Sequence, residues 1–204
     1  MMEVRIHGRG GQGAVIASQI LADAAFRDQM YVQAFPSFGS ERRGAPVRAF
    51  LRLHHSPVLV RSEIYHPDAV IILDQGLITL GLDDVCSGLK PGGWILINSP
   101  RDPAEFPHLA EFAVATVDGS AIGRKHRLGS AAAPVVNTAM AGAFVSLTEI
   151  ASLEQLAHAV RGAVPVKPDE NVAAAMEGAQ KVRRIRPSKL NLPGTPQAVG
   201  SVEE

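Results

Sequence analysis

The chain has 204 residues, of which 46% are hydrophobic and 20% charged, and its 20 basic and 20 acidic side chains cancel to a formal net charge of zero. This length and composition are typical of one well-buried soluble domain, with no overall attraction to nucleic acid or to an anionic membrane. Because Cys86 is the only cysteine, the chain cannot form an internal disulfide, a four-thiolate iron–sulfur cluster or a zinc ribbon.

A glycine-rich loop stands between an expected strand and an expected helix. Residues 3–7 alternate as a strand, and residues 14–28 carry apolar side chains at helical spacing. Between them lies Gly8-Arg9-Gly10-Gly11-Gln12-Gly13. The unpaired amides and the dipole of a helix N-terminus at the end of a strand favour a phosphate or another anion. We therefore expect this loop to be a backbone anion site or a tight packing joint against another chain.

The loop also matches a dinucleotide-binding fingerprint by letter, in the register Gly8-x-Gly10-x-x-Gly13. Such a site needs an acidic residue at the end of the second strand, where it binds the ribose. The second strand is expected at Met30–Ala34, and it ends without one. The nicotinamide-dinucleotide interpretation is therefore incomplete, and a free-standing nucleotide-binding protein remains an alternative.

A second unusual segment, residues 35–46, carries two prolines, two glycines and a charged centre, and is expected to be a long loop. Its Arg42 and Arg43 could bind a phosphate or a carboxylate bidentately. A solvent-facing loop or an intersubunit salt bridge are the alternatives. Phe35 and Phe38, if exposed there, would suit a protein–protein contact.

The rest of the chain alternates between strands and helices. Pro46–Leu53 is expected to form an antiparallel hairpin with Val58–Val60, because so short a connection leaves no room for a parallel crossover. Further strands are expected at 68–74, 94–98 and 112–117, and further helices at 77–85, from 121, from 137, at 153–163 and at 169–182. Asp118 and Ser152 are expected to cap two of these helices.

This order predicts an α/β fold: a three-layer α/β/α Rossmann-like domain, residues 1–185, whose mixed sheet is mostly parallel and includes one antiparallel hairpin. The proline-rich residues 186–204 are expected to be an extended or disordered tail. Ligands of such sheets bind at the carboxyl ends of the strands. We therefore expect the glycine loop, the 35–44 loop and the Asp74–Gly76 turn to converge on one site.

No complete catalytic constellation is visible in the sequence. The histidines form no HxH or HxxxH pair, and neither a GxSxG elbow nor a P-loop lysine occurs. We therefore predict no catalytic residue and no metal site. His7 is the histidine for which a ligand role stays open, because it ends the first strand beside the glycine loop.

The two unusual segments together resemble the gamma subunit of 2-oxoacid:ferredoxin oxidoreductases, in the pyruvate and 2-oxoisovalerate branch. The resemblance is carried by HGRGGQG at residues 7–13 and by FGSERRGAPVRAF at residues 38–50. The segments 67–71, 98–99 and 137–143 are also similar to that family. The resemblance covers roughly residues 3 to 180.

This resemblance implies a cytoplasmic, multi-subunit enzyme that decarboxylates a 2-oxoacid oxidatively, forms an acyl-coenzyme A and passes electrons to ferredoxin. It implies that thiamine diphosphate, magnesium and iron–sulfur clusters are held by partner subunits of the alpha, beta and delta type. Coenzyme A would be a substrate of the complex, and this chain would help to bind it and shape the active-site entrance. The isolated chain is expected to be inactive, with no nucleic-acid or membrane partner. A purely structural assembly subunit is the alternative.

The residues expected to contact coenzyme A combine the glycine loop, the long loop and one helix start. They are Gly8, Arg9, Gly10, Gly11, Gln12, Gly13, Ser37, Gly39, Arg42, Arg43 and Asn137.

Overall fold

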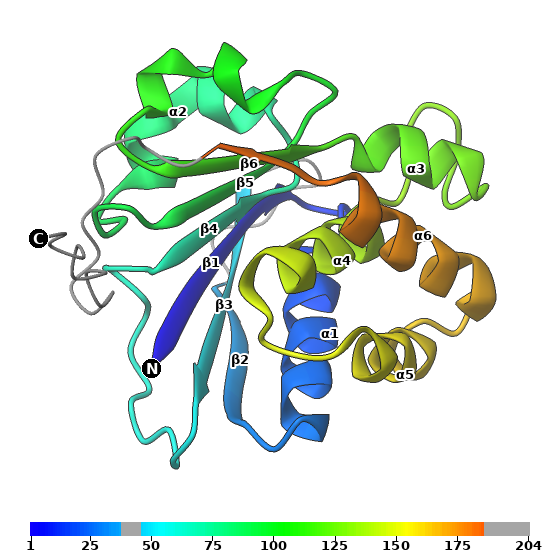
Figure 1. Ribbon diagram of the computed structural model, residues 1–204, viewed down its shortest axis with the longest axis horizontal. Coiled ribbons are helices and arrows are strands. Elements are labelled where there is room, and N and C mark those ends of the chain that lie inside the picture. The colour runs from blue at the N-terminus through cyan, green and yellow to red at the C-terminus, as the bar shows by residue number, and fades with distance from the viewer. Residues whose placement is uncertain (38–45, 186–204) are drawn as a thin grey trace, which may run out of the picture.

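The computed structural model describes residues 1–37 and 46–185 (Figure 1). Within these residues a seven-stranded sheet has the order β2-β3-β1-β4-β5-β6-β7. Strands β3 and β7 run against the other five, so the predicted mixed, mostly parallel sheet is confirmed. The strands are β1 (Met2–Arg9), β2 (Tyr31–Ser37), β3 (Pro46–His54), β4 (Ala69–Ile72), β5 (Trp94–Asn98), β6 (Ala113–Val117) and β7 (Arg183–Ile185).

Helices cover both faces of this sheet and complete the three layers (Figure 1). Helices α1, α4, α5 and α6 lie on one face, and α2 lies on the other. The helices are α1 (Ala14–Arg27), α2 (Gly76–Cys86), α3 (Gly119–Lys125), α4 (Asn137–Thr148), α5 (Leu153–Ala163) and α6 (Pro168–Lys181), with short 3-10 turns at Pro103–Glu105 and Pro107–Leu109. Among the described residues, no helix has the length and apolar character to cross a membrane.

The hydrophobic core is divided by the sheet into a larger and a smaller part. The larger part joins β1, β3 and the neighbouring strands to α1 and α4, with Ile6, Leu21 and Phe144 among its buried side chains. The smaller part packs Val70 and Ile95 beside residues of α2. Because β4 and β5 are buried on both faces, their sequences are continuously apolar instead of alternating.

The structure contains an antiparallel hairpin, but not the one predicted between Pro46–Leu53 and Val58–Val60. Strand β3 pairs with β2, Phe35 lying opposite Phe50, and no strand forms at Val58–Val60. Strand β2 continues three residues beyond the expected Ala34. Phe35 is therefore a half-buried strand residue, its ring centroid 5.1 Å from that of Phe50. Pro36 is tolerated because β2 is an edge strand, where a missing amide breaks no ladder bond.

The carboxyl-terminal part of the described chain contains a strand that the sequence pattern does not reveal. Strand β7 pairs antiparallel with β6 at the far edge of the sheet. Its three residues are all exposed, so they carry no period-two alternation that could predict a strand. The tail after residue 185 lies outside the described residues, and both the domain boundary and the nature of the tail stay predictions.

Candidate functional site

The glycine loop connects the carboxyl end of β1 to the first turn of α1, as predicted. Gly13 is the residue before the helix and has a left-handed conformation, with φ 79°. Gly11 also has a positive φ, of 96°, and a Cβ at this position would meet no other atom within 4 Å. The first turn of α1 has no side-chain cap and no acidic residue. Its amides and dipole are therefore uncompensated by any neighbouring carboxylate of the helix itself.

The glycine loop is joined to the end of β4 by the carboxylate of Asp74. Arg9 Nε lies 2.8 Å from Asp74 Oδ2, and Gln12 Nε2 donates to the same oxygen at 3.1 Å. The amide of Gly76 donates to Asp74 Oδ1 at 2.8 Å. Partial burial raises the pKa of Asp74, but the hydrogen bonds from Gly76, Gln12 and Arg9 outweigh it and hold that pKa below its usual value. Asp74 is therefore a structural anion that fixes the loop.

Asn98 and Ser120 extend this polar edge to β5 and β6. Asn98 Nδ2 donates to the Leu73 carbonyl at 3.0 Å and to Ser120 Oγ at 3.1 Å. Asp118 caps α3 as predicted, accepting a hydrogen bond from the Ala121 amide at 2.8 Å. Sequence reasoning did not select Asn98 or Ser120 as site residues. The signal that could have found them is their position, since Asn98 ends the buried strand β5 and Ser120 follows closely after the buried strand β6.

These carboxyl ends surround a cavity of about 640 Å³. It is lined by the glycine loop (Gly10, Gly11, Gln12), the turn after β4 (Leu73, Asp74, Gln75), the ends of β5 and β6 (Asn98, Pro100, Asp118, Ser120), Arg124 and residues 132–136. Two of the three loops expected to converge, the glycine loop and the Asp74–Gly76 turn, therefore do so.

The remaining predicted site residues lie in three different places. Asn137 is buried beside Gly13, where an added Cβ would come within 3.1 Å of its Cγ; it supports the loop and does not line the cavity. Ser37 ends β2, and its Oγ donates to Glu63 Oε1 at 2.7 Å. Gly39, Arg42 and Arg43 lie outside the described residues, so their role stays a prediction.

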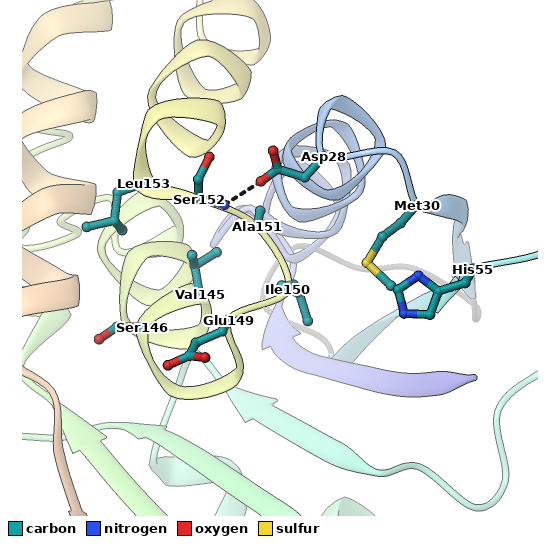
Figure 2. Close-up of a pocket in the computed structure, with 10 residues that line it drawn as sticks. All are labelled: Asp28, Met30, His55, Val145, Ser146, Glu149, Ile150, Ala151, Ser152 and Leu153. Atoms are coloured by element: carbon teal, nitrogen blue, oxygen red, sulfur yellow. Dashed lines mark hydrogen bonds between the residues drawn. The ribbon is translucent and has the colours of Figure 1, made fainter.

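A second cavity, of about 590 Å³, lies at the opposite end of the sheet (Figure 2). It is formed where α1 and α4 end and α5 begins, with Met30 and His55 on one side and Val145 and Ile150 on the other. In Figure 2 the carboxylate of Asp28 accepts a hydrogen bond from the backbone at Ser152, so it serves to join α1 to α5. Ligands of mostly parallel sheets bind at the other end, and we therefore place the candidate site at the glycine loop.

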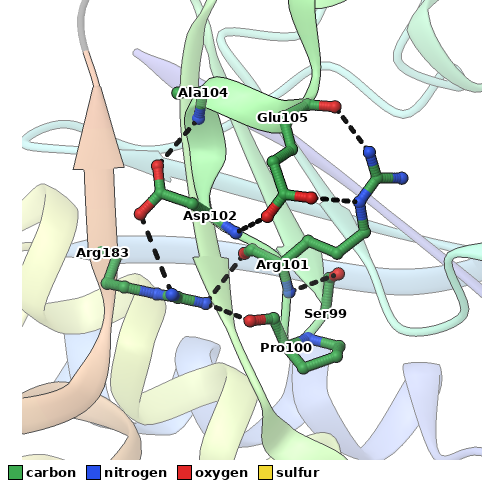
Figure 3. A network of polar contacts seen from close by, with 7 residues as sticks. All are labelled: Ser99, Pro100, Arg101, Asp102, Ala104, Glu105 and Arg183. Carbon is green, nitrogen blue, oxygen red and sulfur yellow. Dashed lines mark hydrogen bonds and ion pairs between the residues drawn. The ribbon is translucent and has the colours of Figure 1, made fainter.

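The wall of the first cavity near Pro100 is fixed by strand β7 (Figure 3). The guanidinium of Arg183 donates to the carbonyls of Pro100 and Arg101 and lies 3.8 Å from the carboxylate of Asp102. Asp102 and Glu105 form a reciprocal capping box on the following turn. The last described strand thus holds the segment that leads away from β5.

Comparison with known proteins identifies the family. A family model described as pyruvate ferredoxin/flavodoxin oxidoreductase matches residues 3–181. The chain is 43% identical, over 91% of its own length and 98% of the relative's, to pyruvate synthase subunit PorC of Methanothermobacter thermautotrophicus. It is 42% identical to the common gamma subunit of the pyruvate/ketoisovalerate oxidoreductases of Thermococcus kodakarensis, over 88% of this chain and 95% of that one.

Solved structures agree with this assignment. The pyruvate oxidoreductase subunit PORC of Thermotoga maritima superimposes with a TM-score of 0.75 at 32% identity, over 90% of this chain and 97% of that one. The 2-oxoglutarate:ferredoxin oxidoreductase of Magnetococcus marinus, solved with coenzyme A bound, shares the fold with a TM-score of 0.66 at 20% identity, over 88% of this chain and 30% of that one. This chain belongs to the pyruvate ferredoxin/flavodoxin oxidoreductase family and is similar along nearly its whole length to the family's gamma subunits.

Proposed function

We propose that this chain is the gamma subunit of a cytoplasmic pyruvate- or related 2-oxoacid:ferredoxin oxidoreductase, and that its glycine-loop cavity binds the phosphates of coenzyme A. The complex would decarboxylate the 2-oxoacid, form the acyl-coenzyme A and pass electrons to ferredoxin. Thiamine diphosphate, magnesium and the iron–sulfur clusters would be held by alpha-, beta- and delta-type partner subunits. The observation that carries the proposal is the uncapped, acid-free N-terminus of α1 beside a cavity of about 640 Å³.

The chemistry of this cavity suits a phosphorylated ligand. Backbone amides at a helix N-terminus bind phosphate oxygens without a competing side chain. The two carboxylates that line the cavity are already engaged, Asp74 by Arg9, Gln12 and the Gly76 amide, and Asp118 by the Ala121 amide. Gly11 leaves space for a ligand to approach the backbone, since nothing lies within 4 Å of the position of its absent Cβ.

Replacing Gly11 tests this role in the assembled complex. A valine at φ 96° is strained and places a branched side chain where the phosphates would lie. We expect Gly11→Val to raise the apparent KM for coenzyme A about tenfold or more, while kcat at saturating coenzyme A changes little. The measurement is steady-state ferredoxin reduction at varied coenzyme A.

The matched control is Gly92→Val, which introduces the same strain at φ 73° in the turn before β5, at the other end of the sheet. It should leave the apparent KM for coenzyme A unchanged. An unchanged KM in a fully assembled Gly11→Val complex would instead favour a purely structural subunit.

Removing both charges of Arg42 and Arg43 by glutamine substitution tests the predicted contribution of the long loop by the same assay.

A further inference from the structure

A row of polar side chains crosses three strands on the face of the sheet away from α1. His7 of β1 lies directly opposite Arg48 of β3, and Arg48 lies directly opposite Ser37 of β2. Residues opposite one another in antiparallel strands point to the same face, with their Cβ atoms about 4.5–5.5 Å apart. The adjacent pair, Ile6 and Ala49, belongs to the large core that includes α1. The row therefore faces the other way.

His7 is the buried end of this row. Its side chain is 3% exposed, and its Nε2 forms no hydrogen bond with any described residue. A buried polar atom without a partner costs about 1–3 kcal/mol, so such atoms are rare in native proteins. Burial and then the positive charges of Arg5 and Arg48 lower the pKa of His7 to about 3. The ring is therefore neutral at physiological pH and has one nitrogen free for a ligand.

Arg48 is half-buried beside it and forms no ion pair within residues 1–37 and 46–185. Two nearby carboxylates are engaged elsewhere, since Glu3 pairs with Arg52 at 2.8 Å and Asp74 pairs with Arg9. A third, that of Glu63, lies at the open end of the row and accepts from Ser37 at 2.7 Å.

Arg5 adds a further positive charge and donates to the backbone carbonyls of Val85 and Ser87. Arg5 and Arg48 together outweigh the single carboxylate of Glu63, so the row has an excess of positive charge. It is closed at His7 and partly open to solvent at Ser37 and Arg48.

We propose that His7, Arg48 and Ser37 form a binding site for a small oxyanion, a carboxylate or a phosphate group, on this second face of the sheet. The planar guanidinium of Arg48 binds two oxygens of the anion, and His7 donates through Nε2–H in its neutral form. Ser37 lies at the open end of the row, with its hydroxyl held by Glu63. The site is separate from the glycine-loop cavity, since none of the three residues lines that cavity.

The test follows the ring nitrogens of His7 by NMR in the full-length chain labelled with nitrogen-15 histidine. Inorganic phosphate and pyruvate are titrated separately at constant ionic strength, with chloride as the reference anion. We expect a saturable shift of the His7 signals, and a bound anion should raise the pKa of His7 because it favours the imidazolium. The anion that saturates at lower concentration identifies phosphate or carboxylate as the preferred group.

Arg48→Met should weaken this binding by about tenfold or more, since it removes a charge-assisted bidentate contact. Arg184→Met is the matched control, because Arg184 is an exposed strand arginine of β7 without an ion pair among the described residues. It should leave the titration unchanged. If Arg48→Met does not fold, as judged by circular dichroism, Arg48→Lys provides the same test, because lysine keeps the charge but loses the fork geometry.

The proposal is wrong if neither anion shifts the His7 signals saturably, or if Arg48→Met and Arg48→Lys bind as tightly as the unchanged chain. The Nε2 atom would then be satisfied by water. This outcome is independent of the proposed coenzyme A role, which is measured by an apparent KM in the complex.

Discussion

The two faces of the sheet are built from different kinds of contact. On the face of α1, α4, α5 and α6, most buried side chains are apolar and many are small. The buried polar side chains on this side belong to the helices, such as Asn137, Asn171 and Glu177. On the opposite face of β1 and β3, charged and polar side chains are buried, with Arg5, His7 and Arg52 at most 4% exposed. The difference indicates a division of roles. The first face supplies stability through close packing, whereas the second keeps costly buried charge that packing alone would not require.

Close packing on the first face is tightest where α4 crosses α6. A Cβ added to Gly142 would overlap the backbone carbonyl of Ala175, and one added to Gly178 would overlap that of Ala139. The contact is therefore backbone against backbone, and no flexible side chain can move aside. We expect Gly142→Ala to lower the free energy of unfolding by more than about 3 kcal/mol, measured by urea denaturation.

Gly162→Ala in α5 is the control for the intrinsic effect of alanine, because nothing lies within 4 Å of its absent Cβ. Helix propensity alone should make it neutral or up to about 1 kcal/mol stabilising. Equal effects of the two substitutions would show that the α4–α6 crossing is not the constraint described above.

On the second face, we expect substitution of Arg52, which is 1% exposed, to lower the free energy of unfolding the most. Its guanidinium pairs with Glu3 at 2.8 Å and donates to Gln33 at 3.0 Å and to the Glu63 carbonyl at 3.3 Å. Arg52→Met leaves these acceptors without their donor, so we expect the free energy of unfolding to fall by about 3 kcal/mol.

The double variant Glu3→Gln with Arg52→Met removes both charges. It should recover part of the loss, since the uncompensated carboxylate is gone. A double variant that is less stable than Arg52→Met alone would mean that Glu3 contributes through other contacts.

The fold was predictable from the sequence wherever local signals decide it. One such signal is the continuous apolar sequence of β4 and of β5. Another is the helix cap: Ser152 accepts a hydrogen bond from the Gln155 amide at 3.3 Å, as predicted. The glycine loop was correctly placed for the same reason. Periodicity, capping and turn chemistry each involve residues close together in the chain.

Strand pairing could not be predicted in the same way. Val58–Val60 follows β3 closely in the sequence, but β3 pairs with β2 and with β1. Even the closest pair of the β1–β3 register, Arg9 and Pro46, is separated by 37 positions in the sequence. The His7–Arg48 pair and the Asn98–Ser120 contact depend on such non-local pairing. These contacts are therefore visible only in the structure, although the sequence singles out His7 as the end of the first expected strand, beside the glycine loop.

A last prediction concerns a charged residue that interrupts the apolar face. Glu177 of α6 is 9% exposed and lies 2.8 Å from Lys125, 2.7 Å from His126 and 2.7 Å from Lys181. The hydrogen bonds from Lys125 and Lys181 lower its pKa from 4.5 to about 2 against the effect of burial. Since the unfolded state binds the proton more tightly, this stabilisation is complete above pH 4.5 and is lost as the pH falls towards 2.

Glu177→Gln should therefore lower the free energy of unfolding at pH 7 by about 1–3 kcal/mol, and the gap from the unchanged chain should narrow as the pH is reduced to 3. Urea denaturation at both pH values measures this difference in the free energy of unfolding. Glu111→Gln is the control, because Glu111 is exposed and forms no ion pair with a described residue. A stability difference between the variant and the unsubstituted chain that stays constant from pH 7 to pH 3 would mean that Glu177 contributes through packing. The charge of its carboxylate would then not stabilise the fold.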